Sequence, residues 1–61
     1  MKSSELFKKL KKAGWYEVSQ AGSHIKLRHD DFKDPVIFPF HGSKEVSPGL
    51  QNAILKQAGL K

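Results

Sequence analysis

The sequence contains no cysteine, which excludes both a disulfide-stapled scaffold and a zinc site built from thiolates. Small secreted domains usually depend on such staples, so their absence favours a cytoplasmic protein. The chain also has no apolar run near the roughly 20 residues that a membrane-spanning helix needs, and no stretch that resembles a signal peptide. These absences argue against a membrane protein and against a secreted precursor.

The chain is also short, because its 61 residues leave room for one small domain, residues 1–61. Hydrophobic residues make up 38% and charged residues 28%, which is ordinary for a soluble globular domain. A domain of this length buries only about 60% of the surface that its unfolded chain exposes. We therefore expect modest stability and exclude a multidomain enzyme.

Positive charge exceeds negative charge: eleven lysines and arginines face six aspartates and glutamates, for a formal net charge of +5. A field of this sign favours a polyanion or an acidic protein as the partner. Arg28 is the only arginine, so nearly all of the positive charge is carried by lysine. Lysine suits a general attraction to phosphates better than the bidentate reading of base edges, which arginine performs best.

The first predicted helix covers about residues 3–13. We expect Ser3 or Ser4 to cap its start and Gly14 to end it in a left-handed conformation. The spacing places apolar and basic side chains on opposite faces, with Leu6, Phe7, Leu10 and Ala13 opposite Lys8, Lys9, Lys11 and Lys12. The basic face is either a solvated helix surface or a track for a phosphate backbone, and composition alone does not separate the two.

The second predicted helix begins after Ser47, a capping serine followed by Pro48 at the first helical position. It runs to about Ala58, and Gly59 ends it. The apolar spacing predicts that its inner face is formed by Leu50, Ala53, Ile54 and Gln57.

The middle of the chain is rich in β-branched and aromatic residues and predicts three strands, at 15–20, 24–29 and 36–38. Residues 21–23 (Ala-Gly-Ser) read as a tight turn, so the first two strands form a hairpin. Residues 30–35 are expected to form a polar loop with Phe32 inside it. Pro39 closes the third strand, because proline cannot donate a hydrogen bond to a strand ladder.

The predicted order is α-β-β-β-α, an α+β fold. A three-stranded antiparallel sheet can carry both helices on one face and leave the other face wet. This is the layout of a double-stranded-RNA-binding domain. Trp15 and Tyr16 are the aromatic residues that could stack on RNA bases, but one of them must face the core. We expect that residue to be Trp15, which can fold back on Leu10.

His24 is the residue that most strongly indicates chemistry. It opens the second strand directly after a turn, and the strand period of two places Lys26 and Arg28 on the same face. An imidazole could take a proton from a ribose 2′-hydroxyl while the two cations stabilise charge on the phosphoryl oxygens. Taken alone, however, this spacing favours an ordinary surface histidine among solubilising charges.

The other two histidines have weaker patterns. His41 lies in the loop before the second helix and could be a second proton carrier, although capping a loop or helix is the commoner role. His29 shares a face with Ile25 and Leu27, so we expect it at the edge of the core. His24 and His29 point to opposite faces of a regular strand, and their spacing matches no usual ligand pattern, so we predict no metal site.

Several stretches resemble a known family when they are taken together and in order. They are Met-Lys-Ser-Ser-Glu-Leu at 1–6, Ala-Gly-Trp at 13–15, Gly-Ser-His-Ile-Lys-Leu-Arg at 22–28, Phe-Pro-Phe-His at 38–41, Lys-Glu at 44–45 and Ala-Ile-Leu-Lys-Gln-Ala-Gly-Leu at 53–60. The ordered set covers essentially the whole chain. It resembles the HicA (YcfA-like) toxins of bacterial type II toxin–antitoxin systems.

The resemblance implies a ribonuclease of the mRNA-interferase type on a double-stranded-RNA-binding-like fold, neutralised by a HicB antitoxin. It also implies cleavage of mRNA without a metal or a small-molecule cofactor, in the cytoplasm and away from membranes. The family's catalytic histidine follows a Gly-Ser turn, which is the position of His24 here. We expect His24 to be catalytic and His41 to be a possible accessory, with RNA contacts from Gly22, Ser23, Lys26 and Arg28.

One segment departs from the family pattern. Many relatives begin the second helix with Gly-Thr-Leu-Arg, whereas this chain has Gly-Leu-Gln-Asn at 49–52. No arginine is therefore available from this helix for a phosphate contact.

Three hypotheses follow from the sequence. The first is an endoribonuclease toxin that uses His24. The second is a non-catalytic RNA-binding module of the same fold, which would bind RNA in a salt-dependent manner without cutting it. The third is a protein-interaction domain whose basic surface meets an acidic partner, and it is compatible with the first because an inhibitor would cover the site.

Overall fold

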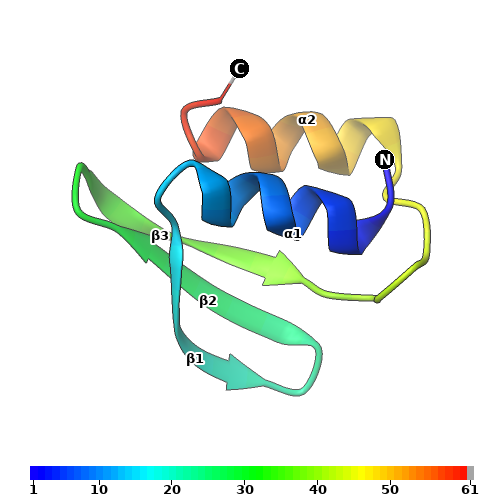
Figure 1. Cartoon of the computed structure of the whole chain (residues 1–61), viewed down its shortest axis with the longest axis horizontal. Coiled ribbons are helices and arrows are strands. Elements are labelled where there is room, and N and C mark those ends of the chain that lie inside the picture. Colours follow the sequence, from blue (N-terminus) through cyan, green and yellow to red (C-terminus); the bar gives the residue numbers. More distant parts are fainter. Residues whose placement is uncertain (61) are drawn as a thin grey trace.

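The computed structural model describes residues 1–60 and has the expected α-β-β-β-α order (Figure 1). The elements are α1 (Ser3–Lys12), β1 (Tyr16–Ala21), β2 (His24–His29), β3 (Phe32–Pro39) and α2 (Pro48–Gln57). The strands form one antiparallel sheet in the order β1-β2-β3. Both helices cover one face of this sheet and run in the same direction (Figure 1). The predicted α+β layout, similar to a double-stranded-RNA-binding domain, is confirmed.

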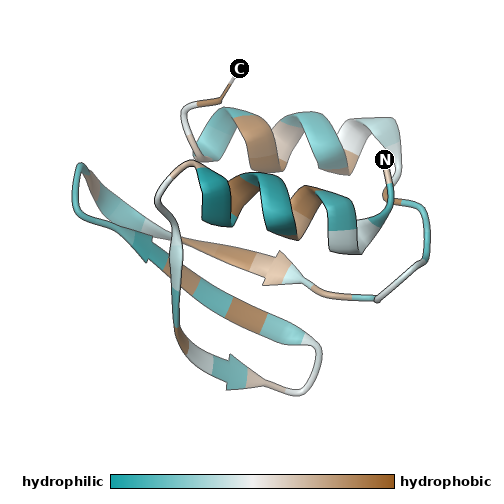
Figure 2. Cartoon of the chain, in the orientation of Figure 1, coloured by the Kyte–Doolittle hydropathy of each residue, from teal (hydrophilic) through white to brown (hydrophobic). Residues whose placement is uncertain are grey.

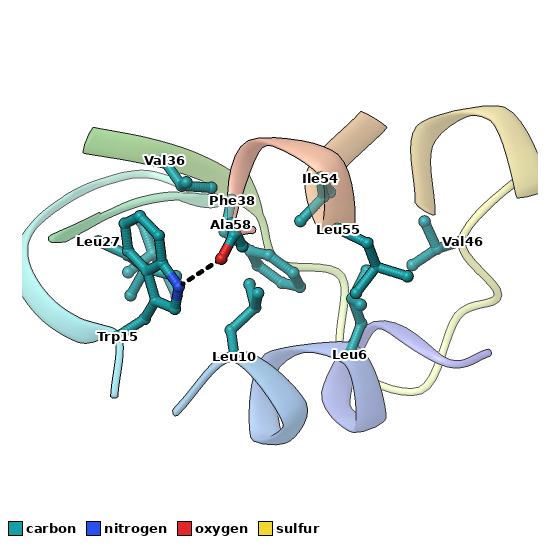
Figure 3. Packing of buried hydrophobic residues seen from close by; sticks show 11 residues of the cluster. Leu6, Leu10, Trp15, Leu27, Val36, Phe38, Val46, Ile54, Leu55 and Ala58 are labelled. Carbon is teal, nitrogen blue, oxygen red and sulfur yellow. Dashed lines mark hydrogen bonds between the residues drawn. The ribbon is translucent and has the colours of Figure 1, made fainter. Parts of the chain in front are cut away.

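The hydrophobic core lies between the helices and the inner face of β2 and β3 (Figure 3). Apolar and polar residues alternate along β2 (Figure 2), as expected for a strand with one wet face. The fully or nearly fully buried side chains come from both helices, two strands and the connecting segments: Leu6, Leu10, Trp15, Ile25, Leu27, Val36, Phe38, Val46, Ile54, Leu55 and Ala58. The inner face predicted for the first helix is confirmed by the burial of its leucines.

Trp15 joins the ends of the two helices. Its side chain is 2% exposed, and its indole Nε1–H donates to the carbonyl of Ala58 at 3.3 Å (Figure 3). Its backbone N–H donates to the carbonyl of Leu10 at 3.1 Å, after a reversal at Gly14, whose φ is +104°. Because glycine adopts this conformation without steric cost, the chain can turn back at once and bury the indole. The expectation that Trp15, not Tyr16, faces the core is confirmed.

The start of α1 is capped differently from the sequence prediction, which assigned the cap to Ser3 or Ser4. Lys2 occupies the cap position and makes no side-chain capping bond. The N–H groups of Ser3 and Ser4 instead donate to the carbonyls of Lys44 and Gly42, each at 2.9 Å. The loop before α2 therefore supplies acceptors for the first N–H groups of this helix, and no serine side chain caps it.

The third strand is longer than predicted, because it begins at Phe32 and not at residue 36. Only Asp30 and Asp31 form the turn, so the predicted polar loop over residues 30–35 is wrong. Leu27 pairs with Val36 and His29 pairs with Phe32, so β3 has more residues than β2 between these two pairs. The strand accommodates them by an irregularity in its register. Proline is tolerated within this strand because β3 is at the edge of the sheet.

The second helix begins as predicted, but Ile54 is the one residue of its four predicted inner residues that is buried. The Ser47 hydroxyl accepts the N–H of Leu50 at 3.4 Å, and Pro48 opens the helix. Leu50 is 42% exposed, however, and the predicted inner residues Ala53 and Gln57 are also exposed. The buried residues of this helix and its C-terminal end are Ile54, Leu55 and Ala58. Trp15, which is distant in sequence, donates its indole N–H to the Ala58 carbonyl, so a long-range contact helps to decide which residues at this end of the helix are buried.

Both helices are ten residues long. Among residues 1–60, no helix is long and apolar enough to cross a membrane. All six residues of β1 are exposed, so this strand is held by its pairing with β2 and extends beyond the part of the sheet that the helices cover (Figure 1).

Candidate active site

The face of the sheet turned away from the helices carries a row of polar side chains along β2. Ile25 and Leu27 are buried, at 4% and 0% exposure, and belong to the core. Because side chains alternate along a strand, His24, Lys26 and Arg28 point to the opposite face. His24 is exposed, and the two cations are half-buried. The strand thus has the alternation expected of it and presents one imidazole and two cations in a line.

His24 occupies the first position of β2, at a rim of the sheet. The turn before it consists of Gly22 and Ser23, both exposed, and a Cβ added to Gly22 would meet nothing within 4 Å. The end of β3 holds this rim from the other side, because Pro39 pairs with His24 and the N–H of Phe40 donates to the Ser23 carbonyl at 2.7 Å. The turn is therefore fixed in position and still open to a ligand backbone.

Lys26 and Arg28 lie at different distances from His24. A strand rises about 3.3 Å per residue, so Lys26 is about 7 Å and Arg28 about 13 Å from His24 along β2. The Arg28 guanidinium also donates from Nη2 to the Lys33 carbonyl at 3.2 Å, which draws it toward the start of β3. Lys26 is therefore the cation nearer to His24 along the strand, and Arg28 is directed away from it.

The remaining open face mixes polar and apolar side chains. Lys26 is paired with Ser19 of β1 and Ile37 of β3, and Ile37 is 49% exposed. Tyr16 pairs with Arg28 at the far end of the row and is 44% exposed. The open face therefore offers polar groups, one aromatic ring and one aliphatic side chain to a ligand that lies along it.

His41 follows β3 at the same end of the sheet as His24. Its side chain is exposed, and its backbone N–H donates to the Ser3 hydroxyl at 3.1 Å. The Ser3 hydroxyl in turn donates to the Pro39 carbonyl, with an Oγ–O distance of 3.5 Å. Ser3 therefore ties the start of α1 to the segment that pairs with His24, and it does so from a fully buried position.

His29 belongs to the core edge and not to the site. Its ring centroid lies 5.3 Å from that of Trp15 and 5.1 Å from that of Phe32. Its Nε2 lies 2.9 Å from the Ala13 carbonyl, and its Nδ1 accepts the N–H of Asp31 at 3.0 Å. A neutral imidazole with its proton on Nε2 satisfies both bonds. The prediction that His29 lies at the edge of the core is confirmed.

Within residues 1–60, no group of three or more His, Asp or Glu side chains is placed to hold a metal ion. The first turn of α2 contains no acidic residue, and Leu50 and Asn52 are exposed.

Two residues that shape the site, Ser3 and Phe40, were not predicted from the sequence. Ser3 was assigned to capping, although it precedes Leu6 by three residues and Leu10 by seven. That spacing places it on the buried stripe of α1 and could have identified it as a buried polar group. Phe40 carried no such signal, because its contact with the turn at Ser23 depends on the register of β3.

Replacing Ser3 with alanine should leave the Pro39 carbonyl and the His41 N–H without a partner. A buried polar group left in this state costs about 1–3 kcal/mol, and we expect a loss of unfolding free energy in that range. Urea denaturation followed by circular dichroism measures it. The half-buried neighbour Ser4 provides the control, because Ser4→Ala should change stability by no more than about 0.5 kcal/mol. Equal losses for the two variants would contradict the role of the Ser3 hydroxyl.

The fold and the site together define a small basic α+β domain of the double-stranded-RNA-binding type, with a histidine and a lysine at an open rim. Comparison with known proteins gives the family. The sequence model of the family described as "HicA toxin of bacterial toxin-antitoxin" matches residues 3–60. The chain therefore belongs to the HicA toxin family, and the resemblance noted in the sequence is confirmed.

Two curated relatives match over nearly their full length. The "Probable mRNA interferase HicA" of Pseudomonas fluorescens (strain Pf0-1) is 41% identical over 61 residues, which is 100% of this chain and 98% of the relative. The "Probable mRNA interferase HicA 1" of Photorhabdus laumondii subsp. laumondii is 42% identical over 60 residues, which is 98% of this chain and 100% of the relative.

Proposed function

We propose that this protein is an mRNA interferase, a toxin that cuts RNA with His24 and without a metal ion. The observation that carries the proposal is the position of His24, exposed at a rim, directly after a turn open to a ligand backbone and one strand period from Lys26. Membership of the HicA toxin family and the names of the two relatives support an RNA-cleaving activity.

In the proposed reaction, the His24 imidazole takes the proton of a ribose 2′-hydroxyl. The 2′-oxygen forms a bond to the adjacent phosphorus, and the bond between phosphorus and the 5′-oxygen breaks. The leaving 5′-oxygen takes a proton from the imidazolium, or from His41 or water, in which case the imidazolium then returns its proton to that donor. The products are a 2′,3′-cyclic phosphate and a 5′-hydroxyl, so atoms and charge balance without any further reactant.

The other site residues bind and orient the RNA in this proposal. Lys26 stabilises the negative charge that develops on the attacked phosphate, and Arg28 holds the next phosphate along the strand. The exposed turn of Gly22 and Ser23 lets the sugar–phosphate chain approach His24 closely, because glycine carries no side chain there. His41, at the same end of the sheet, is an accessory donor to the leaving group.

We further propose that a HicB-type antitoxin neutralises this toxin in the cytoplasm by covering the rim around His24. The net charge of +5 supports an inhibitor with an acidic surface. Mixing the two proteins at micromolar concentration should give a complex that no longer cuts RNA. Failure to form a complex, or a complex with undiminished activity, would reject HicB as the partner.

A second candidate function is an RNA-binding module without catalysis. It is favoured by one observation: within residues 1–60, the His24 side chain makes no hydrogen bond that would orient it, whereas catalytic bases are usually held by a third group. Under this alternative, RNA would be retained by the protein with strong salt dependence and would stay intact.

Replacing a single ribose in the substrate tests the proposed chemistry. After the cut position has been mapped, an RNA with one 2′-deoxy nucleotide at the 5′ side of that bond should resist cleavage there. The matched control has its deoxy nucleotide one position further away and should be cut normally. Cleavage of both at the same rate, or products with a free 3′-hydroxyl, would show that the 2′-oxygen is not the nucleophile.

A further inference from the structure

We propose that single-stranded RNA leaves the His24 rim over the ring of Phe40 and continues along the outer face of α1, where Lys8 and Lys12 bind its phosphates. The inference deepens the proposed function and rests on it, because it takes RNA as the substrate. It assigns a role to a basic helix face and an aromatic pair that the proposed cleavage chemistry does not use.

A continuous series of contacts connects the rim to α1. The backbone N–H of Phe40 donates to the carbonyl of Ser23, the residue before His24. The rings of Phe40 and Phe7 are 5.3 Å apart at 73°, an edge-to-face contact. The Lys11 ammonium lies 5.2 Å from the centre of the Phe7 ring. The series of contacts thus runs from the backbone of the turn before His24, through two half-buried rings, to a lysine on α1.

Phe7 and Phe40 form a partly exposed aromatic surface on which a nucleotide base could stack. Phe7 and Phe40 pack against the core, yet both remain half-buried, so part of each ring stays accessible. Proteins that bind single strands place aromatic rings beside cations, because every base has a face that can stack on a ring. Phe40 lies one residue beyond Pro39, the strand position paired with His24, so it is next to the turn that precedes the proposed catalytic residue.

The lysines of α1 have unequal environments. Lys11 pairs with Glu17 at 3.1 Å, whereas Lys8, Lys9 and Lys12 have no ion pair within residues 1–60. Lys8 and Lys12 are four residues apart and therefore lie one above the other, about 6 Å apart along the helix axis. Like charges in this arrangement destabilise a helix, so a ligand that neutralises both would relieve the repulsion.

The shape of this face also suits a ligand. Lys8, Lys9 and Lys12 surround an open depression of the helix surface together with one carboxylate, that of Glu5. Lys8 and Lys12 form the helix row next to the one that carries Phe7 and Lys11, because residues four apart align along a helix. A strand that passes over the aromatic pair therefore reaches Lys8 and Lys12 without crossing the helix.

Binding measured in the His24→Ala background tests the path independently of cleavage. The probe is a short fluorescent single-stranded RNA, and anisotropy gives its affinity as a function of salt. The test variant is Lys8→Gln with Lys12→Gln. The control, Lys33→Gln with Lys56→Gln, removes the same charge from β3 and α2. The slope of log affinity against log salt should become shallower by about 1.4 in the test variant, at roughly 0.7 per phosphate contact, and should stay unchanged in the control.

Phe40→Leu tests the aromatic step, because it keeps the apolar bulk and removes the ring. Loss of one stacked base should weaken RNA binding by roughly 5- to 150-fold, while circular dichroism stays that of the parent. Equal slopes for the two lysine variants, or unchanged affinity with Phe40→Leu, would overturn the path. If the α1 variant lost antitoxin binding and kept RNA binding, the face would be a protein interface. If the parent bound no RNA at all, both the path and the proposed function would fail.

Discussion

Replacing His24 with alanine is expected to lower the rate of RNA cleavage by roughly 10²- to 10⁴-fold, the usual contribution of a general acid–base group. The substitution should leave the fold intact, because the His24 side chain is exposed and contributes nothing to the core. RNA binding should persist, since most of the positive charge comes from lysines on other elements. Single-turnover cleavage of a labelled RNA, with protein in excess, measures the chemical step directly.

His41→Ala is the matched control for this prediction. His41 is also an exposed histidine at the same end of the sheet. Its backbone N–H donates to the Ser3 hydroxyl, and this bond does not depend on the imidazole. Its replacement should reduce the rate by less than the His24 substitution, because the leaving oxygen can take its proton from water. If His41→Ala abolished cleavage and His24→Ala did not, the assignment of the general base would have to move to His41.

Replacing Trp15 with alanine is expected to unfold the protein. Removal of a buried tryptophan costs about 3–5 kcal/mol. A chain of this length has a total unfolding free energy of roughly 3–9 kcal/mol. The indole also donates the hydrogen bond that joins α1 to the end of α2, and its ring contacts Phe32 with a centroid distance of 5.0 Å. Circular dichroism at increasing temperature should show a lost or strongly lowered transition.

Tyr16 provides the comparison, because it is the next residue and also aromatic. It is 44% exposed, and its hydroxyl donates to the Asp30 carboxylate at 3.2 Å on the surface. Tyr16→Ala should therefore cost no more than about 1 kcal/mol. A larger loss for Tyr16 than for Trp15 would mean that the core is not organised around the indole.

The parts of the fold that depend on local sequence could be predicted. The Ser47-Pro48 start of α2 is a local signal, since the capping serine and the proline act within one turn. The bounds of β2, His24–His29, were also predicted, because its apolar and polar residues alternate without interruption. In both cases the residues that decide the structure are neighbours in the chain.

The errors arose where distant segments decide the structure. Phe32 belongs to β3 because it pairs with His29 and packs against Trp15, and neither contact is visible in the run of polar residues around it. The cap of α1 comes from carbonyls some forty residues away, so no local pattern near Ser3 could reveal it. The inner face of α2 follows contacts with the rest of the core for the same reason.

In the candidate site, too, some features depend on neighbouring residues and others depend on distant segments. The alternation of β2 is sufficient to predict that His24, Lys26 and Arg28 share a face. It does not predict that the Lys33 carbonyl draws Arg28 away from His24, or that Phe40 lies beside the turn at Ser23. Those features depend on the pairing of β2 with β3. The chemistry proposed for His24 is thus suggested by a local motif, and the surroundings that would bind the RNA are set by the sheet.

The measurement that tests the account most directly is a cleavage assay of the purified protein in EDTA, beside His24→Ala prepared in parallel. A long single-stranded RNA is incubated with each protein, and the products are separated on a gel. Our account predicts that the wild-type protein cuts the RNA in EDTA and that the variant does not. Loss of wild-type cleavage in EDTA, or equal cleavage by the two proteins, would contradict a metal-independent nuclease centred on His24.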